Sequence, residues 1–232
     1  MISEKHFDHA DQAAHWLAEQ IAGRLQSAID ARGAASLVLS GGRSPIPLLK
    51  ALGHQPLDWA RIGVTLTDER WVETSSADSN ENLLRTHLLI GEAAKARFIP
   101  FKTSATLAGD ALAERADAIA AMPHPFDVVV LGMGEDGHFA SLFPDALGLE
   151  QALDPKGSAL LADIDPPAAA YDRLSLTLSA ILDSRWIVLP IHGETKRCVY
   201  AEAVNGASPL VRPIAAVFQQ NRVPIQVCLI DS

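Results

Sequence analysis

The chain has 232 residues, of which 48% are hydrophobic, which is enough for one domain with a large core. A net charge of -9 without any run of Lys and Arg argues against a nucleic-acid partner. No apolar run reaches the roughly 18 residues of a membrane helix, and the N-terminus lacks a signal-peptide core. Cys198 and Cys228 fit no metal or redox spacing, so we expect buried free thiols and a cytoplasmic protein.

Helix and strand patterns alternate from the start of the chain. Apolar residues at three- and four-residue spacing predict an amphipathic helix over 8–32, with Asp8 as its N-cap. The apolar segment 36–40 predicts a buried strand, which leads through Gly41-Gly42-Arg43-Ser44 into a helix that starts near Pro45. A strand, a glycine turn and a helix present backbone N–H groups to an anion, although the Walker A pattern is absent.

The same alternation continues to the C-terminus. Further strands are expected at 61–67, 98–101, 127–131, 186–191 and 225–230, and further helices at 79–89 and 106–122, after 177 and from 196. Residues 145–170 are expected to be irregular and to form a small subdomain or a lid. The alternation predicts an α/β fold with a mainly parallel, Rossmann-like sheet, helices on both faces, and a single domain over 1–232.

Polar or glycine-rich turns follow three predicted strands, after residues 40, 67 and 131. Because the carboxyl ends of parallel strands share one edge, these turns should meet, and Arg173 and Lys196 occupy similar transitions. The turn after 131 carries Asp136 and His138. A carboxylate beside an imidazole fixes its tautomer and raises its basicity, which indicates a general base. Asp68-Glu69-Arg70 belongs either to this site or to a surface charge cluster.

Three other functions fit these residues less well. The segment 132–137 matches the dinucleotide fingerprint, but Pro144 follows too soon for the long helix that this motif requires. Glu135 and Asp136 would also lie where the pyrophosphate of a dinucleotide binds. Asp136, His138 and Asp68 could hold a metal ion, but no histidine pair has the i, i+4 spacing. A serine hydrolase would need a G-x-S-x-G motif, which is absent.

In their order along the chain, the motifs resemble those of the 6-phosphogluconolactonases, which are relatives of the glucosamine-6-phosphate deaminases. The similar segments are Leu39–Pro45, Thr67–Trp71, Ser79–Asn82, Leu131–Pro144, Arg173–Thr177 and Gly193–Lys196. Arg43 stands where the family usually has a hydroxyl residue, and Phe139 replaces a common threonine. The deaminases carry a glutamate at the position of Phe143. Because a phenylalanine cannot relay a proton, the resemblance favours a lactonase.

The resemblance implies hydrolysis of 6-phospho-D-glucono-1,5-lactone, the second step of the oxidative pentose phosphate pathway, without a metal or other cofactor. His138 would be the general base, oriented by Asp136, and Arg70 or backbone N–H groups over 134–138 would stabilise the oxyanion. The phosphate group would meet Gly41, Gly42, Ser44, Arg173 and Lys196, with Arg43 and Asp68 as further substrate contacts. No nucleic acid or membrane partner is expected, and the enzyme would be a monomer or a small homo-oligomer.

Two alternatives stay open at this point. A glucosamine-6-phosphate deaminase would use the same pocket and release ammonia. A sugar-phosphate sensor would bind its ligand without turnover, although no DNA-binding segment is evident.

Overall fold

The computed structural model describes residues 1–166 and 170–231, and most of the strands within them form one parallel sheet. This sheet has seven strands in the order β1-β10-β9-β6-β2-β3-β5, all paired in parallel. The strands are β1 Ile2–Phe7, β2 Ala35–Leu39, β3 Ile62–Leu66, β5 Arg97–Phe98, β6 Val128–Val130, β9 Ile187–His192 and β10 Ile225–Ile230. The expected mainly parallel α/β architecture is confirmed.

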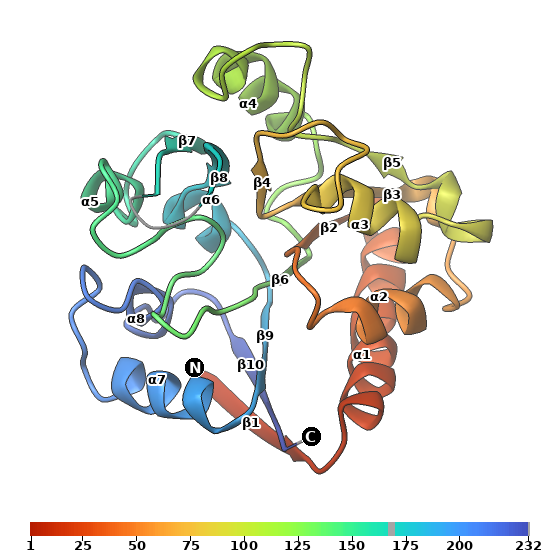
Figure 1. Cartoon of the computed structure of the whole chain (residues 1–232). Helices are drawn as coiled ribbons and strands as arrows, with labels where there is room; N and C mark the ends of the chain where they lie inside the picture. The colour runs from red at the N-terminus through yellow and green to blue at the C-terminus, as the bar shows by residue number, and fades with distance from the viewer. Residues whose placement is uncertain (167–169, 232) are drawn as a thin grey trace.

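Helices cover both faces of this sheet. Figure 1 shows α1, α2 and α3 on one side and α7 and α8 on the other. The helices are α1 Ala10–Arg32, α2 Ile46–Gly53, α3 Asn80–His87, α4 Leu112–Ala120, α5 Leu149–Ala152, α6 Leu178–Leu182, α7 Glu194–Val204 and α8 Ala215–Phe218. Because both faces are covered, every residue of β2, β3 and β6 is buried. None of the helices in the described ranges is both long and apolar enough to cross a membrane.

A smaller antiparallel sheet in the order β4-β8-β7 lies beyond the carboxyl end of β3. Its strands are β4 Asp68–Arg70, β7 Leu161–Ile164 and β8 Arg173–Leu176. Both β7 and α5 fall within 145–170, so the expectation that this segment is irregular is wrong for these two elements. Their apolar residues Leu149, Leu161 and Ile164 are buried, which explains why the segment is ordered there. Residues 167–169 of the segment lie outside the described residues.

The N-terminal strand β1 was not indicated by the sequence pattern. Five of its six residues are exposed, because β1 is an edge strand held mainly by its pairing with β10, and only Phe7 is buried. The strand extends to Phe7, which leaves Asp8 in the connection. The N-cap of α1 is therefore His9, and the prediction of Asp8 as the cap is wrong.

The two cysteines differ in environment. Cys228 is buried in β10, as expected, and burial raises the pKa of its thiol to about 12. Cys198 is exposed on α7, so the expectation of a buried thiol is wrong for this residue. Both thiols are free.

The strands β2 and β6 are neighbours at the centre of the sheet, and the chain leaves them in opposite directions. After β2 it continues to β3 and β5, whereas after β6 it continues to β9 and β10. In open α/β sheets, such a reversal of strand order opens a crevice at the carboxyl ends of the two strands, where ligands bind. The turn that begins at Gly41 and the turn that ends at His138 follow these two strands, so they flank the crevice.

Candidate active site

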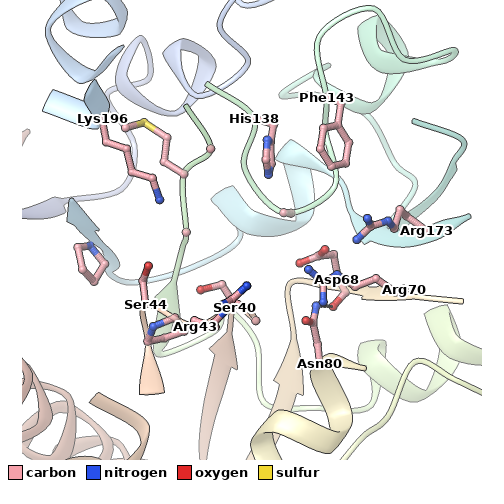
Figure 2. Close-up of a pocket in the computed structure, with 18 residues that line it drawn as sticks. Ser40, Arg43, Ser44, Asp68, Arg70, Asn80, His138, Phe143, Arg173 and Lys196 are labelled. Atoms are coloured by element: carbon pink, nitrogen blue, oxygen red, sulfur yellow. Dashed lines mark hydrogen bonds between the residues drawn. The ribbon is translucent and has the colours of Figure 1, made fainter. Parts of the chain in front are cut away.

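A pocket of about 440 Å³ lies over this crevice, within the usual size range of small-molecule sites. Figure 2 shows the 18 residues that line it. Every residue that the sequence predicted for the site lines this pocket except Asp136, which lies behind His138 and contacts its ring. The pocket also includes Ser40, Pro45, Asn80, Gly132, Met133, Gly134, Ala140, Phe143 and Pro190.

The turn after β2 uses its two glycines for different reasons. Gly42 has a φ of +90°, which favours glycine. At Gly41 the reason is close approach, since a Cβ atom there would lie 1.9 Å from Oδ1 of Asn80. The backbone N–H groups of residues 41–44 donate no hydrogen bond within the described part of the chain. The turn therefore presents unused donors to the pocket, as an anion site requires.

The turn after β6 holds a carboxylate against an imidazole. Nδ1 of His138 lies 2.6 Å from Oδ1 of Asp136, and the same oxygen accepts a hydrogen bond from the backbone N–H of His138 at 3.1 Å. Burial opposes ionisation of Asp136, but the hydrogen bonds and charge of His138 outweigh it and lower the pKa of Asp136. An ionised carboxylate only accepts, so Nδ1 carries the proton, and in the neutral imidazole Nε2 keeps its lone pair.

Gly134 makes this arrangement possible. A Cβ atom at this position would lie 2.2 Å from Nδ1 of His138 and 2.5 Å from Oδ1 of Asp136. The N–H of Gly134 donates to the carbonyl of His138 at 2.8 Å, and the N–H of Gly137 donates to the carbonyl of Gly134 at 3.1 Å. These two N–H groups, and that of His138, are thus used inside the turn.

Phe143 packs against the imidazole. The ring centroids of His138 and Phe143 are 4.2 Å apart and the planes are inclined by 33°. The aromatic ring also lies near Arg173, whose Cζ is 5.8 Å from the Phe143 centroid. Figure 2 shows His138 and Phe143 side by side above the pocket. The residue beside the imidazole in this pocket is therefore apolar.

Asp68 and Glu69 have structural partners that the sequence did not reveal. The two carboxylate oxygens of Asp68 accept hydrogen bonds from the hydroxyls of Thr67, at 2.8 Å, and Ser141, at 2.6 Å. Glu69 is fully buried, so the alternative of a surface charge cluster is wrong for this residue. Its carboxylate accepts hydrogen bonds at the start of α3, from the N–H groups of Asn80 and Glu81, both at 2.7 Å. Burial nevertheless raises the pKa of Glu69.

Arg70 and Arg173 are directly opposite each other across β4 and β8. Arg173 is the first residue of β8 and does not follow a strand of the main sheet, contrary to the sequence-based expectation. Burial, and next the charge of Arg70, lower the pKa of Arg173. Like charges that face each other in a sheet are destabilising, so an arginine pair in a pocket indicates a place for an anion. Nε of Arg70 is buried and has no partner among the described residues.

The other cationic residues lie across the pocket from this pair. Figure 2 shows Lys196 and Ser44 on one side, Arg70 and Arg173 on the other, and His138 between them. Lys196 lies in the first turn of α7, and Arg43 is exposed in the glycine turn. Four cationic side chains and one carboxylate, that of Asp68, line the pocket of a chain with a net charge of -9. The pocket is therefore suited to an anionic ligand.

The described residues contain no group of three or more His, Cys, Asp or Glu side chains arranged to hold a metal ion.

The sequence did not identify Asn80 as a pocket residue, although Asn80 lies in the segment 79–82 that resembles the family. Its Nδ2 donates to the carbonyl of Asp68 at 2.8 Å, and this hydrogen bond connects the start of α3 to β4. Arg212 was also missed, since no motif surrounds it, and it contacts the turn that carries Asp136.

Comparison with known proteins agrees with the motifs. The family model described as glucosamine-6-phosphate isomerases/6-phosphogluconolactonase matches residues 8–225. A 6-phosphogluconolactonase of Pseudomonas aeruginosa is 44% identical over 221 residues, which cover 95% of this chain and 88% of that protein. One of Pseudomonas putida is 45% identical over 208 residues, covering 89% and 85%. The crystal structure of a 6-phosphogluconolactonase from Shewanella baltica OS155 superimposes with a TM-score of 0.96 at 42% identity, covering 99% of this chain and 98% of that one.

Proposed function

The chain belongs to the glucosamine-6-phosphate isomerase/6-phosphogluconolactonase family, and we propose that it hydrolyses 6-phospho-D-glucono-1,5-lactone to 6-phospho-D-gluconate. The observation that carries this proposal is the imidazole of His138, which lines a cationic pocket with Asp136 behind it and Phe143 beside it. One base, cationic side chains and Phe143, rather than a second acid, beside the base suit the hydrolysis of a phosphorylated lactone.

His138 acts as the general base through Nε2, because Nδ1 is held by Asp136. It takes a proton from a water molecule as the water oxygen attacks the lactone carbonyl carbon. When the tetrahedral intermediate collapses, the bond between that carbon and the ring oxygen breaks, and the imidazolium returns the proton to the ring oxygen. The ionised carboxylate of Asp136 stabilises the imidazolium between these two steps.

Arg70 stabilises the oxyanion that forms on the carbonyl oxygen. Of the N–H groups over 134–138 that the sequence also offered as donors, those of Gly134, Gly137 and His138 take part in hydrogen bonds of their own turn. The guanidinium of Arg70 lines the pocket and is held in place by Nη1, which donates to the carbonyl of Asp78 at 2.7 Å. A guanidinium that is already held in position suits the stabilisation of a charge that develops in the transition state.

The phosphate group binds on the opposite side, against the unused N–H groups of residues 41–44, the hydroxyl of Ser44 and the ammonium of Lys196. Arg43, at the exposed end of the same turn, adds a second cation there. Arg173, which the resemblance groups with the phosphate, lies beside Arg70, so we assign it to the lactone end. The two cationic ends fix the direction in which the substrate binds.

The reaction as proposed uses no metal ion. Asp68 accepts hydrogen bonds from Thr67 and Ser141, and Oδ1 of Asp136 contacts His138, so each carboxylate has a role in the proposal that needs no metal ion. A δ-lactone is an activated ester, and one positioned base with an oxyanion donor is sufficient for its hydrolysis.

The test compares wild-type protein with His138→Ala in the hydrolysis of 6-phosphogluconolactone, measured as acid release above the spontaneous rate. We expect the variant to lose about 10²- to 10⁴-fold in kcat/KM. His54→Ala is the matched control, because His54 is exposed directly after α2 and its ring contacts the carbonyl of Lys50 rather than the pocket. Full activity of His138→Ala would exclude the general-base role, and no hydrolysis by wild type would exclude the activity itself.

Two further measurements separate the alternatives. Ammonia release from glucosamine 6-phosphate would identify a deaminase, and binding of phosphogluconate without any turnover would identify a sensor. With unphosphorylated gluconolactone we expect a much lower kcat/KM, and Lys196→Met should affect only the phosphorylated substrate. Equal activity on both lactones would contradict the assignment of the phosphate site.

A further inference from the structure

Arg212 forms a hydrogen bond to the outer side of the turn that carries Asp136 and His138. It lies in the connection between α7 and α8, far along the chain from the turn. Its Nη1 donates to the backbone carbonyl of Asp136 at 3.2 Å. Its Nε donates to Oε2 of Glu202 on α7 at 2.8 Å. One guanidinium thus joins the turn to the helix that presents Lys196.

The same connection packs closely against the tip of the turn. Gly137 has a φ of +84°, and a Cβ atom there would lie 2.9 Å from Cδ and 3.2 Å from Cα of Arg212. The N–H of Ile214 donates to the carbonyl of Gly137 at 2.8 Å. Two successive carbonyl groups, those of Asp136 and Gly137, are therefore fixed by two residues of one short segment.

These contacts act on the exposed side of the turn, where Asp136 lies. The side chain of Asp136 is 46% exposed, whereas that of Arg212 is 28% exposed. Inside the turn, the peptide group between Asp136 and Gly137 is held through its N–H, which donates to the carbonyl of Gly134, whereas its carbonyl oxygen accepts the hydrogen bond from Arg212. Rotation of that peptide group would swing the carboxylate of Asp136 away from Nδ1 of His138.

We propose that Arg212 is a positioning residue that sets the orientation of Asp136 toward His138. The inference rests on the proposed function, because the imidazole must act as the base for its orientation to matter. Arg212 fixes the peptide of Asp136, Asp136 fixes the ring of His138, and Nε2 of that ring faces the pocket. Glu202 restrains the guanidinium of Arg212, which is therefore held by hydrogen bonds both to α7 and to the turn.

The experiment measures kcat and KM for lactone hydrolysis by Arg212→Met, which keeps the stem and removes both hydrogen bonds. We expect kcat to fall about tenfold with KM within about twofold of wild type, since a misplaced base affects the transition state more than substrate binding. The matched control is Arg222→Met. Arg222 also donates to a distant carbonyl, that of Pro155 at 3.2 Å, but it does not touch the turn, so its kcat should not change.

A double-mutant cycle with Asp136→Asn distinguishes positioning from a general loss of stability. If Arg212 acts through Asp136, Arg212→Met should cost less than about twofold in kcat once the carboxylate is gone. An equal loss in both backgrounds, or an unchanged kcat in the single variant, overturns the inference. Lactone hydrolysis by wild type is measured in the same series, and its absence overturns the proposed function together with this inference.

Thermal unfolding of each variant shows whether it is folded. If Arg212→Met does not fold, Arg212→Lys and Glu202→Gln provide the test. Each is a milder change that disturbs the hydrogen bonds joining Glu202, Arg212 and the carbonyl of Asp136. We expect kcat losses of about threefold for each, with KM unchanged. Unchanged kcat in both variants overturns the inference as well.

Discussion

The carboxylate of Asp136 contacts His138 twice, once at Nδ1 of the imidazole at 2.6 Å and once at the backbone N–H at 3.1 Å. Both contacts use the same oxygen, Oδ1, so the turn closes on itself around one atom. The arrangement leaves Nε2 as the basic nitrogen toward the pocket.

Replacing Asp136 by asparagine should lower kcat for lactone hydrolysis by about 100-fold or more, because the amide no longer holds the proton on Nδ1 or stabilises the imidazolium. The measurement is kcat near neutral pH for purified protein. Glu135→Gln serves as the control, since Glu135 is exposed in the same turn. A similar loss in both variants would mean that charge in the turn matters, rather than the contact with His138.

The same pair predicts a pH dependence of stability. Because the pKa of Asp136 is lowered in the folded protein, its contribution is present above the ordinary value of 3.8 and is lost as pH falls through the lower folded value. The free energy of unfolding of wild type should therefore decrease over this acidic range more steeply than that of Asp136→Asn. Equal slopes would contradict the lowered pKa.

Gly134→Ala should lower kcat by about 100-fold while the protein stays folded, because the new methyl group displaces His138 and Asp136 by the order of an ångström. The matched control is Gly23→Ala in α1, where a Cβ atom meets nothing within 4 Å. We expect this control to keep full kcat and to gain about 0.5–1 kcal/mol in unfolding free energy. Retained activity of Gly134→Ala would show that the turn can adapt.

Glu69→Gln should reduce the free energy of unfolding by about 2–4 kcal/mol, because the buried carboxylate accepts several hydrogen bonds and an amide nitrogen cannot accept them. The effect is read from urea unfolding, with Glu73→Gln, at an exposed position, as the control. The raised pKa of Glu69 adds a stabilising contribution that is complete below its ordinary value of 4.5 and is lost as pH rises through the higher folded value. This decrease should be absent in Glu69→Gln.

Arg173→Met should lower kcat/KM by about 10- to 100-fold on phosphorylated and unphosphorylated lactone alike, if Arg173 serves the lactone end of the pocket. The thermal midpoint without ligand should change little. Relief of the repulsion from Arg70 is offset by loss of the hydrogen bonds to the carbonyls of Ala170 and Tyr171. A loss confined to the phosphorylated substrate would instead place Arg173 at the phosphate group. Arg61→Met, in an exposed ion pair, is the control.

The sequence alone determined the type of fold and the position of the crevice. Apolar strands that alternate with helices indicate a parallel sheet, and in such a sheet all carboxyl ends share one edge. The order of elements along the chain was therefore sufficient to bring the turns after β2, β3 and β6 together. Asp136 and His138 lie two residues apart, so their pairing also follows from local sequence.

The tertiary structure decided everything that depends on contacts between distant segments. The pairing of β4 with β8 brings Arg70 opposite Arg173, and Asp68 meets Ser141 only because two turns converge. The same holds for Gly41 against Asn80 and for Arg212 against Asp136. A sequence pattern reports the preferences of neighbours along the chain, whereas these contacts depend on strand register and packing. That is why the buried role of Glu69 and the contact of Arg212 with the turn could be recognised only in the folded molecule.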